Sequence, residues 1–410
     1  MMAKRLNLIL WLLIAAIAIN YIDRGAMSVA APLLVKDLDI GPEKMGLLFS
    51  AFFWSYALFQ LAAGWLVDRY DVKWVYAGGF ALWSAATAAV GFVTGFPSLI
   101  AARLLLGVGE SVAYPACSRL IVRNFPEERR GLVNALVDAG SKLGPAASTL
   151  FGGLVVSHWG WRPLFIVLGA ASLLWLVPWI ALVPSQQSTA ESRQSAIGYP
   201  ELLRRGPVWV TSLGMFCLGY VWYFLLSWLP TYLVKERGLS MSTMAVFGSI
   251  PFLVMAGATT LGGWASDRWI RAGASVTRVR KTFVVGGLAS CGAVMLPAVL
   301  VSDPMVSIAL ISVACACLGM YTSNVWAITQ TLAGPEAAGK WTGVQNAIGN
   351  LGGVLSPALT GFVVARTGSF LFAFFAAIAV SVLGAVSYAI LLGEVHPLTW
   401  QSAAGREKKS

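Results

Sequence analysis

Two charged residues stand inside a long apolar segment near the start of the chain. The motif NYIDRG, residues 20–25, lies between LNLILWLLIAAIAI and AMSVAAPLLV. An arginine guanidinium keeps its charge and presents a planar fork of donors that fits a carboxylate. A neighbouring carboxyl group can take up or release a proton when its surroundings change between dry and wet. Asp23 and Arg24 therefore have the chemistry to exchange a proton and to hold an organic anion.

More charged residues fall inside apolar segments of the first half of the chain: Arg103, Glu110, Arg119, Asp138 and Lys142. The apolar segments of the second half hold no Asp, Glu, Lys, Arg or His in their interiors. Arg103 and Glu110 are seven residues apart and share a helix face, whereas Arg119 falls on the opposite face near a helix end. We therefore expect Asp23 and Glu110 to exchange the proton, with Arg103 supporting them.

Asp138 and Lys142 are four residues apart, which is the spacing of an ion pair along one helical turn. One interpretation is a local pair that neutralises both charges inside the apolar segment. The other is a supporting role in a binding site, shared with the neighbouring Ser141. Arg24 leaves a similar choice, since it can anchor an anion or form a permanent ion pair with Asp23 or Glu110. We favour the anchor, because charges buried in membranes tend to be functional.

The composition indicates which elements must carry these residues. The chain has 410 residues, of which 58% are hydrophobic and 11% charged, and its mean hydropathy is +0.74. Because a soluble domain carries about 25% charged residues, the sequence predicts an all-α protein that crosses a membrane many times. The five cysteines lie in apolar segments and the two histidines at segment ends, so we expect no disulfide framework, metal site or cofactor.

Twelve apolar stretches are long enough to span a bilayer. They are 6–34, 45–67, 74–94, 98–123, 131–157, 162–184, 208–234, 243–266, 281–300, 305–332, 341–366 and 370–393. The first is too long for a signal peptide and is interpreted as an uncleaved span. A polar stretch, PSQQSTAESRQSAIGYPELLRRG, separates the two halves. We therefore predict a six-helix bundle at 1–184, a cytoplasmic linker at 185–207, a second six-helix bundle at 208–393 and a cytoplasmic tail at 394–410.

The positions of lysine and arginine predict the orientation. With the N-terminus inside, 19 of the 29 basic residues fall in cytoplasmic segments, 6 fall outside and 4 lie within the spans. Cytoplasmic loops carry such an excess of positive charge, so we expect both termini in the cytoplasm. The net charge of +11 is spread over short loops, and this pattern does not favour nucleic acid as a partner.

The two halves repeat each other. The pattern GWxxDR closes the second predicted span at Gly64–Arg69 and the eighth at Gly263–Arg268. At a constant offset of 212 residues, Gly131, Asn134, Gly140 and Pro145 correspond to Gly343, Asn346, Gly352 and Pro357. Repeated halves of this kind are typical of two-lobed secondary transporters.

Across its whole length the chain resembles the major facilitator superfamily. The family motif G-x-x-x-D-R-x-G-x-K corresponds to Gly64, Asp68, Arg69 and Lys73, with Asp71 in place of a glycine, and its second copy keeps Gly263, Asp267 and Arg268. We interpret these residues as a gating latch of ion pairs between cytoplasmic helix ends. Four segments are similar to the anion:cation symporter group of this family: NYIDR, FFWSYALFQLAAGWLVDR, RLLLGVGESVAYPA and GVQNAIGNLGGVLSP.

That group includes proton-coupled sugar-acid and organic-anion carriers. Beside Arg24, the resemblance implies substrate contacts at Tyr21, Tyr56, Ser323, Trp326 and Asn346, with Asn350, Trp222 and Tyr223 as secondary candidates. Hydroxyl and amide side chains can bind sugar hydroxyls, and Trp offers an apolar face with one donor. Sugar-acid members tend to have an amide in the fifth span, where this chain has Ser141 and Lys142. A second cation there favours a dianion or an aromatic acid.

The sequence thus predicts a proton-coupled symporter of a small organic anion, such as an aldonate, uronate or aldarate, that works by alternating access in a bacterial cytoplasmic membrane. We expect a monomer whose partners are the anion, protons and the lipid bilayer. The alternatives are a carrier for an aromatic acid or another dicarboxylate, a uniporter, an exchanger or exporter, and a transporter-like sensor. An enzyme is not expected, because no nucleophile–base pair or set of metal ligands accompanies the buried carboxyl groups.

Overall fold

The computed structural model describes residues 2–125, 127–185 and 197–400, although the side chains of a few residues within its helices, Asp68 among them, lie outside the described part. All regular secondary structure in these residues is helical, and every predicted span coincides with helix. Nine helices of the described chain are long and apolar enough to cross a membrane by length and composition. The predicted all-α membrane fold is therefore confirmed.

Contacts group the chain into two compact units. Unit 1 comprises Met1–Ala190, Leu225–Leu253 and Pro357–Phe370. Unit 2 comprises Glu191–Phe224, Val254–Ser356 and Leu371–Ser410. The division into two six-helix domains at a 185–207 linker stays a prediction, since much of that linker lies outside the described residues.

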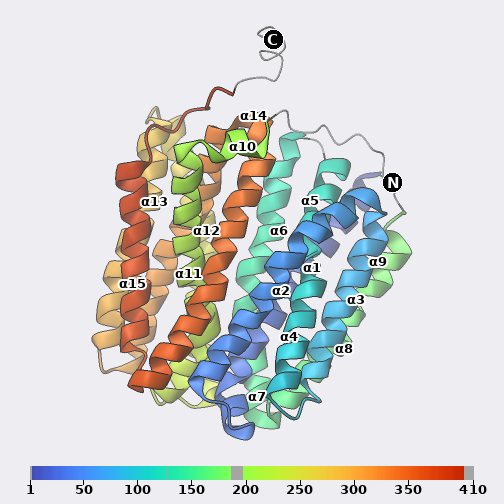
Figure 1. Ribbon diagram of the computed structural model, residues 1–410, viewed down its shortest axis with the longest axis vertical. Helices are drawn as coiled ribbons and strands as arrows, with labels where there is room; N and C mark the ends of the chain where they lie inside the picture. The colour runs from blue at the N-terminus through green and yellow to red at the C-terminus, as the bar shows by residue number, and fades with distance from the viewer. Residues whose placement is uncertain (1, 126, 186–196, 401–410) are drawn as a thin grey trace. The chain divides into compact units, whose positions relative to one another are not determined.

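The helices of the first half of the chain all belong to unit 1 (Figure 1). They are α1 (Met2–Asp37), α2 (Pro42–Arg69), α3 (Val72–Val90), α4 (Phe96–Glu110), α5 (Ala113–Asn124), α6 (Glu127–Ala147), the π-helical turn η1 (Ser148–Gly152), α7 (Gly153–Trp159), α8 (Trp161–Leu173) and α9 (Leu176–Leu182). The second half of the chain forms α10 (Tyr199–Leu203), α11 (Gly206–Lys235), α12 (Met241–Arg271), α13 (Val276–Leu300), α14 (Pro304–Thr367), α15 (Leu371–Val386) and the π-helical turn η2 (Ser387–Leu391).

The fourth predicted span is broken into two helices. α4 ends at Glu110, Ser111 and Val112 form a turn, and α5 begins at Ala113. The physical reason is Pro115, which has no backbone N–H and whose ring clashes with the carbonyl group four residues earlier, that of Ser111. The break therefore makes Glu110 the last residue of α4.

A glycine separates two predicted spans that are joined in α14. Gly334 has a φ of 61°, a left-handed conformation that interrupts the helical backbone between the spans at 305–332 and 341–366. Glycine adopts this conformation without the steric penalty that a side chain brings. The tenth and eleventh predicted spans therefore stay distinct on the two sides of a kink within α14.

Small residues allow helices of unit 1 to approach closely around the buried charges. A Cβ atom at Gly107 of α4 would collide with the Ser55 hydroxyl and the Phe52 carbonyl of α2. A Cβ atom at Gly144 of α6 would lie 2.6 Å from Cβ of Tyr21 on α1. These contacts fix α2 against α4 and α6 against α1, which are the helices that carry most of the charged residues.

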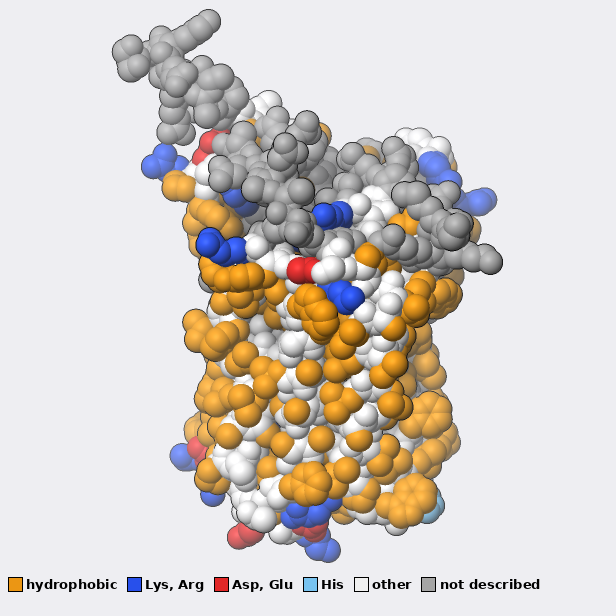
Figure 2. Space-filling model, turned by 90° about the vertical axis from the view of Figure 1, so that its right-hand side faces the viewer, with side chains coloured by type: hydrophobic (Ala, Val, Ile, Leu, Met, Phe, Trp, Pro, Cys, Tyr) orange, Lys and Arg blue, Asp and Glu red, His pale blue; other side chains and the backbone are white. Residues whose placement is uncertain are grey.

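The outer surface agrees with a membrane environment. On the face shown in Figure 2, hydrophobic side chains form a broad band, and Lys, Arg, Asp and Glu side chains lie above and below it. Large apolar residues such as Leu58, Phe151 and Ile390 are 71%, 65% and 74% exposed. Exposed apolar area on this scale is expected where lipid tails, rather than water, surround the helices.

Candidate substrate-binding site

The centre of unit 1 contains a buried ion pair. Nε of Arg24, in the middle of α1, donates a hydrogen bond of 2.7 Å to Oε2 of Glu110 at the end of α4. The side chains are 3% and 0% exposed. The sequence left the partner of Arg24 open between Asp23 and Glu110, and the geometry selects Glu110. A charge-assisted bond of this kind is strong, but either charge left alone at such depth is unfavourable.

Aromatic rings surround the Arg24 guanidinium. Its Cζ atom lies 4.7 Å from the ring centroids of Tyr21 and Phe52 and 4.8 Å from that of Tyr56. Cζ of Arg103 lies 5.1 Å from the centroid of the same Phe52 ring, so both guanidiniums contact this ring. Cation–π contacts stabilise a desolvated guanidinium without neutralising its charge. Arg24 thus remains a centre of positive charge inside the helices.

The predicted residues Tyr21, Tyr56 and Arg103 therefore gather around Arg24, and Phe52 joins them. Sequence reasoning did not single out Phe52. In the sequence, only its spacing from Tyr56 indicates its position: Phe52 precedes Tyr56 by four residues and so lies on the same face of α2. The two rings stack with centroids 5.3 Å apart and an interplanar angle of 25°.

Asp23 is buried beside the ion pair and points to other neighbours. Its side chain is 2% exposed, and neither carboxyl oxygen makes a well-formed hydrogen bond to the described residues. The hydroxyl of Thr87 on α3 lies beside it, and Glu110 and Arg103 are within electrostatic range. Thr87 was not found from the sequence, because a threonine in an apolar segment carries no distinctive signal. Two carboxyl groups, Asp23 and Glu110, thus lie close to the Arg24 charge.

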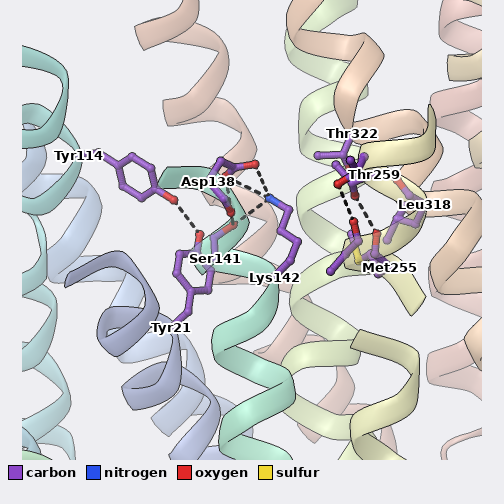
Figure 3. Close-up of polar contacts among 11 residues, drawn as sticks. Tyr21, Tyr114, Asp138, Ser141, Lys142, Met255, Thr259, Leu318 and Thr322 are labelled. Carbon is purple, nitrogen blue, oxygen red and sulfur yellow. Dashed lines mark hydrogen bonds and ion pairs between the residues drawn. The ribbon is translucent and has the colours of Figure 1, made fainter. Parts of the chain in front are cut away.

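A second polar cluster lies on α6 and its neighbours (Figure 3). Nζ of Lys142 donates to both carboxylate oxygens of Asp138, at 3.1 and 2.9 Å, and to Oγ of Ser141 at 2.9 Å. The predicted i,i+4 ion pair is therefore confirmed. Nearby, the Tyr114 hydroxyl of α5 donates to the Tyr21 hydroxyl at 3.4 Å. Tyr21 thus contacts both Arg24 and Tyr114.

The other predicted substrate contacts belong to unit 2. Ser323, Trp326 and Asn346 all lie on α14 and are half-buried, and Ser323 lies against Gly263 of α12. Of the secondary candidates, Tyr223 donates a hydrogen bond of 3.3 Å to Oδ1 of Asn350. The role of these residues in substrate binding stays a prediction.

The two GWxxDR motifs have matching local geometry. Cζ of Arg69 lies 5.5 Å from the ring of Trp65, and Cζ of Arg268 lies 5.6 Å from the ring of Trp264. Each arginine therefore lies over the tryptophan of its own motif, one turn earlier. The side chain of Asp68 lies outside the described part, and a latch between Gly64–Arg69 and other helix ends stays a prediction.

Asp267, in the second copy of the motif, forms an ion pair with a residue that the sequence did not suggest. Nη2 of Arg280 on α13 donates to Oδ1 of Asp267 on α12 at 2.9 Å. Nη1 of the same guanidinium donates to Oγ of Ser266 and to Oδ1 of Asn324, both at 2.9 Å. This cluster joins α12, α13 and α14 within unit 2.

Together, the fold and the site define a many-span α-helical membrane protein with a charged, aromatic-lined centre in its first unit. The chain belongs to the Major Facilitator Superfamily, whose sequence profile matches residues 13–357. It is 31% identical over 382 residues to the hexuronate transporter of Bacillus subtilis, covering 90% of each chain. It is 30% identical over 419 residues to the D-galactonate transporter of Escherichia coli, covering 96% of each chain.

Other comparisons agree with this assignment. The chain is 28% identical over 431 residues to a probable galactarate/D-glucarate transporter of Escherichia coli, covering 96% of each chain. Its fold matches the crystal structure of a bacterial homologue of the human lysosomal transporter Spinster, in an inward-facing and occupied conformation. The TM-score is 0.80, with 19% sequence identity, over 93% of this chain and 96% of that one.

These similarities confirm several predictions. The chain is a multi-pass integral membrane protein and a transporter related to sugar-acid transporters. The resemblance to the anion:cation symporter group is confirmed by its relatives. The expectation that the protein is not an enzyme is confirmed by its membership of a transporter family.

Proposed function

We propose that the protein is a proton-coupled symporter of a small organic anion, a sugar acid such as an aldonate, uronate or aldarate. The observation that carries this proposal is the buried Arg24–Glu110 pair with aromatic rings around it. The names of the relatives, which include hexuronate and D-galactonate transporters, point to the same class of substrate.

In this proposal the substrate carboxylate competes with Glu110 for Arg24. A guanidinium can hold a carboxylate through two parallel hydrogen bonds, which fix the orientation of the anion as well as its position. Once the substrate takes the place of Glu110, a second negative charge at the same buried centre is strongly unfavourable. A proton on Glu110 removes that repulsion, so substrate and proton bind together. Asp23 is a second carboxyl group close enough to take part.

The remainder of the substrate is proposed to contact neutral groups. Tyr21 and Tyr56 offer hydroxyl groups beside Arg24, and Ser323, Trp326 and Asn346 of α14 are the proposed contacts from unit 2. Alternating access of this site to the two sides of the membrane would then move anion and proton together. Gly64–Arg69 and Gly263–Arg268 are the proposed cytoplasmic gating segments.

The Glu110→Gln variant tests this mechanism. Glutamine approximates the shape and hydrogen bonding of a protonated glutamate but cannot release a proton. In proteoliposomes, we expect the variant to retain substrate-for-substrate exchange in a counterflow assay and to lose accumulation driven by an inward proton gradient. The matched control is Glu43→Gln, which removes an exposed carboxylate at the start of α2 and should retain both activities.

The same experiment can reject the proposal. If Glu110→Gln accumulates substrate normally under a proton gradient, then Glu110 does not couple protons to transport, and Asp23→Asn becomes the variant to measure. If neither variant alters gradient-driven uptake while both fold and exchange substrate, the protein is not a proton symporter of the proposed kind.

A further inference from the structure

Lys142 is more deeply buried than the carboxylate that neutralises it. Its side chain is 13% exposed, whereas that of Asp138 is 42% exposed. Asp138 occupies two donor positions of the ammonium group and Ser141 occupies another. The Lys142 ammonium group is thus held inside unit 1, and the Asp138 carboxylate bound to it is the more exposed member of the pair.

This ion pair does not hold helices together. The hydrogen bonds that Lys142 makes to described residues all go to Asp138 and Ser141, which lie within four residues of it on α6 (Figure 3). A local pair of this spacing stabilises a helix by only about 0.2–0.5 kcal/mol. A charged residue in a membrane span costs about 2.5–3.5 kcal/mol even on insertion scales. Helix stability therefore does not explain why the span carries a lysine here.

Lys142 lies close to the proposed anion anchor. α1 and α6 pack against each other in parallel, because a Cβ at Gly144 would meet Tyr21 at 2.6 Å and a Cβ at Gly25 would meet Ser148 at 2.9 Å. Arg24 thus lies level with the residue just before Ser148. Since Lys142 precedes that level by five residues, the two cations are about 8 Å apart along the helix axes at a rise of 1.5 Å per residue.

Two tyrosines connect the surroundings of the two cations. The Tyr21 ring contacts the Arg24 guanidinium, and its hydroxyl accepts a hydrogen bond from Tyr114 at 3.4 Å. Figure 3 shows Tyr21 and Tyr114 beside the Asp138–Lys142 pair. Arg24 and Lys142 of unit 1 thus each hold a carboxylate of the protein, and the hydrogen-bonded Tyr21 and Tyr114 lie near them.

We propose that Lys142 is a second anion-binding residue that makes the transporter selective for substrates with an acidic group at each end of a short hydroxylated chain. The inference rests on the proposed function, in which Arg24 holds the first carboxylate. Asp138 forms an ion pair with Lys142 until the second acidic group of the substrate displaces the Asp138 carboxylate. Because Asp138 is partly exposed, its displaced carboxylate turns towards water and is not left buried without a partner.

A matched pair of sugar acids tests the role of Lys142. Galactonate and galactarate share one carboxylate and the same hydroxyl configuration, and differ in the group at the far end of the chain. Dissociation constants are measured on the purified full-length protein. We expect the wild-type protein to prefer galactarate by at least about tenfold, as a charge-assisted contact implies. Lys142→Gln should abolish most of that preference, while Lys36→Gln, an exposed lysine at the end of α1, should keep it.

A second variant predicts a change in the opposite direction. Asp138→Asn keeps the shape of the side chain but removes the charge that competes for Lys142. We expect this variant to bind galactarate severalfold more tightly than the wild-type protein does, with a smaller change for galactonate. A merely structural ion pair predicts no gain in affinity from either substitution.

The possible results distinguish this inference from the proposed function. Equal losses for both acids in Lys142→Gln, or no gain in Asp138→Asn, overturn the second anion site and leave the symport proposal intact. Tight binding of galactonate with no preference for galactarate in the wild-type protein also overturns the second anion site and leaves the symport proposal intact. Failure of the wild-type protein to bind either acid overturns the second site, and it excludes galactonate and galactarate as substrates of the proposed symporter.

Discussion

At the scale of single residues, Arg24 is held by contacts of two kinds. Glu110 provides a charged hydrogen-bond acceptor, while Tyr21, Phe52 and Tyr56 provide aromatic surfaces that leave the positive charge available to an anion. A planar guanidinium can make both kinds of contact at once. Lysine carries the same charge, but as a compact, strongly hydrated point charge that cannot reproduce the fork or the stacking.

We therefore predict that Arg24→Lys impairs substrate binding although the charge is kept. Loss of part of a charge-assisted pair should cost about 1.5–3 kcal/mol, which corresponds to a loss of affinity of about ten- to a hundredfold. The measurement is a titration of the purified variant with the anion, followed by thermal shift or calorimetry. Arg278→Lys, at an exposed position on α13, is the control and should bind normally. Near-normal affinity in a folded Arg24→Lys protein would rule out the anchor.

The types of residue at this centre could be predicted from the sequence, but not their partners. Asp23 and Arg24 are adjacent and point about 100° apart on a helix, so their spacing alone does not show which of them pairs with Glu110. Spacing within one helix shows which residues share a face, as it did for Arg103 and Glu110. It does not show which neighbouring helix that face meets. For that reason Phe52 and Thr87 could be identified as neighbours of the buried charges only from the tertiary structure.

At the scale of helices, the apolar stretches predicted from hydropathy coincide with helix, because a segment that crosses a membrane must satisfy its backbone polar groups in helical hydrogen bonds. The details depend on single residues instead. Pro115 ends α4 at Glu110, and Gly334 interrupts α14. A proline or glycine in an apolar segment is visible in the sequence. Whether it kinks the helix, breaks it or is accommodated within it depends on the neighbouring helices.

We predict that Gly107→Ala destabilises the protein and weakens substrate binding. The added methyl group would collide with the Ser55 hydroxyl and the Phe52 carbonyl, so α2 must move away from α4 and take Phe52 and Tyr56 with it. Overpacking of this kind costs about 1–3 kcal/mol. The measurements are the melting temperature in detergent and the affinity for the anion.

Gly78→Ala on α3 is the matched control for this substitution. A Cβ atom there has no neighbouring atom within 4 Å, so the gain in helix propensity should leave the melting temperature unchanged or slightly higher. Equal melting temperatures and affinities for the two alanine variants would contradict the close approach of α2 and α4 at Gly107.

At the scale of the whole molecule, the distribution of charge gives the chain its expected orientation. The basic residues concentrate in the segments that the span order places on one side of the membrane, 19 of 29 in all. Short loops with this excess stay in the cytoplasm during insertion. This orientation predicts that the loop between α12 and α13, residues 272–275, is cytoplasmic and that the loop between α13 and α14, residues 301–303, is outside.

Two single-cysteine substitutions test this orientation. Ser302 and Ala272 are exposed, one in each of these loops, while the native cysteines are buried or half-buried and should react little. In intact cells we expect a membrane-impermeant maleimide to label Ser302→Cys and to leave Ala272→Cys unlabelled until the membrane is permeabilised. The unsubstituted protein gives the background. Because α13 alone separates the two loops, they must lie on opposite sides of the bilayer if this helix spans it. The reverse pattern would place both termini outside, and labelling of both sites in intact cells would mean that α13 does not cross the membrane.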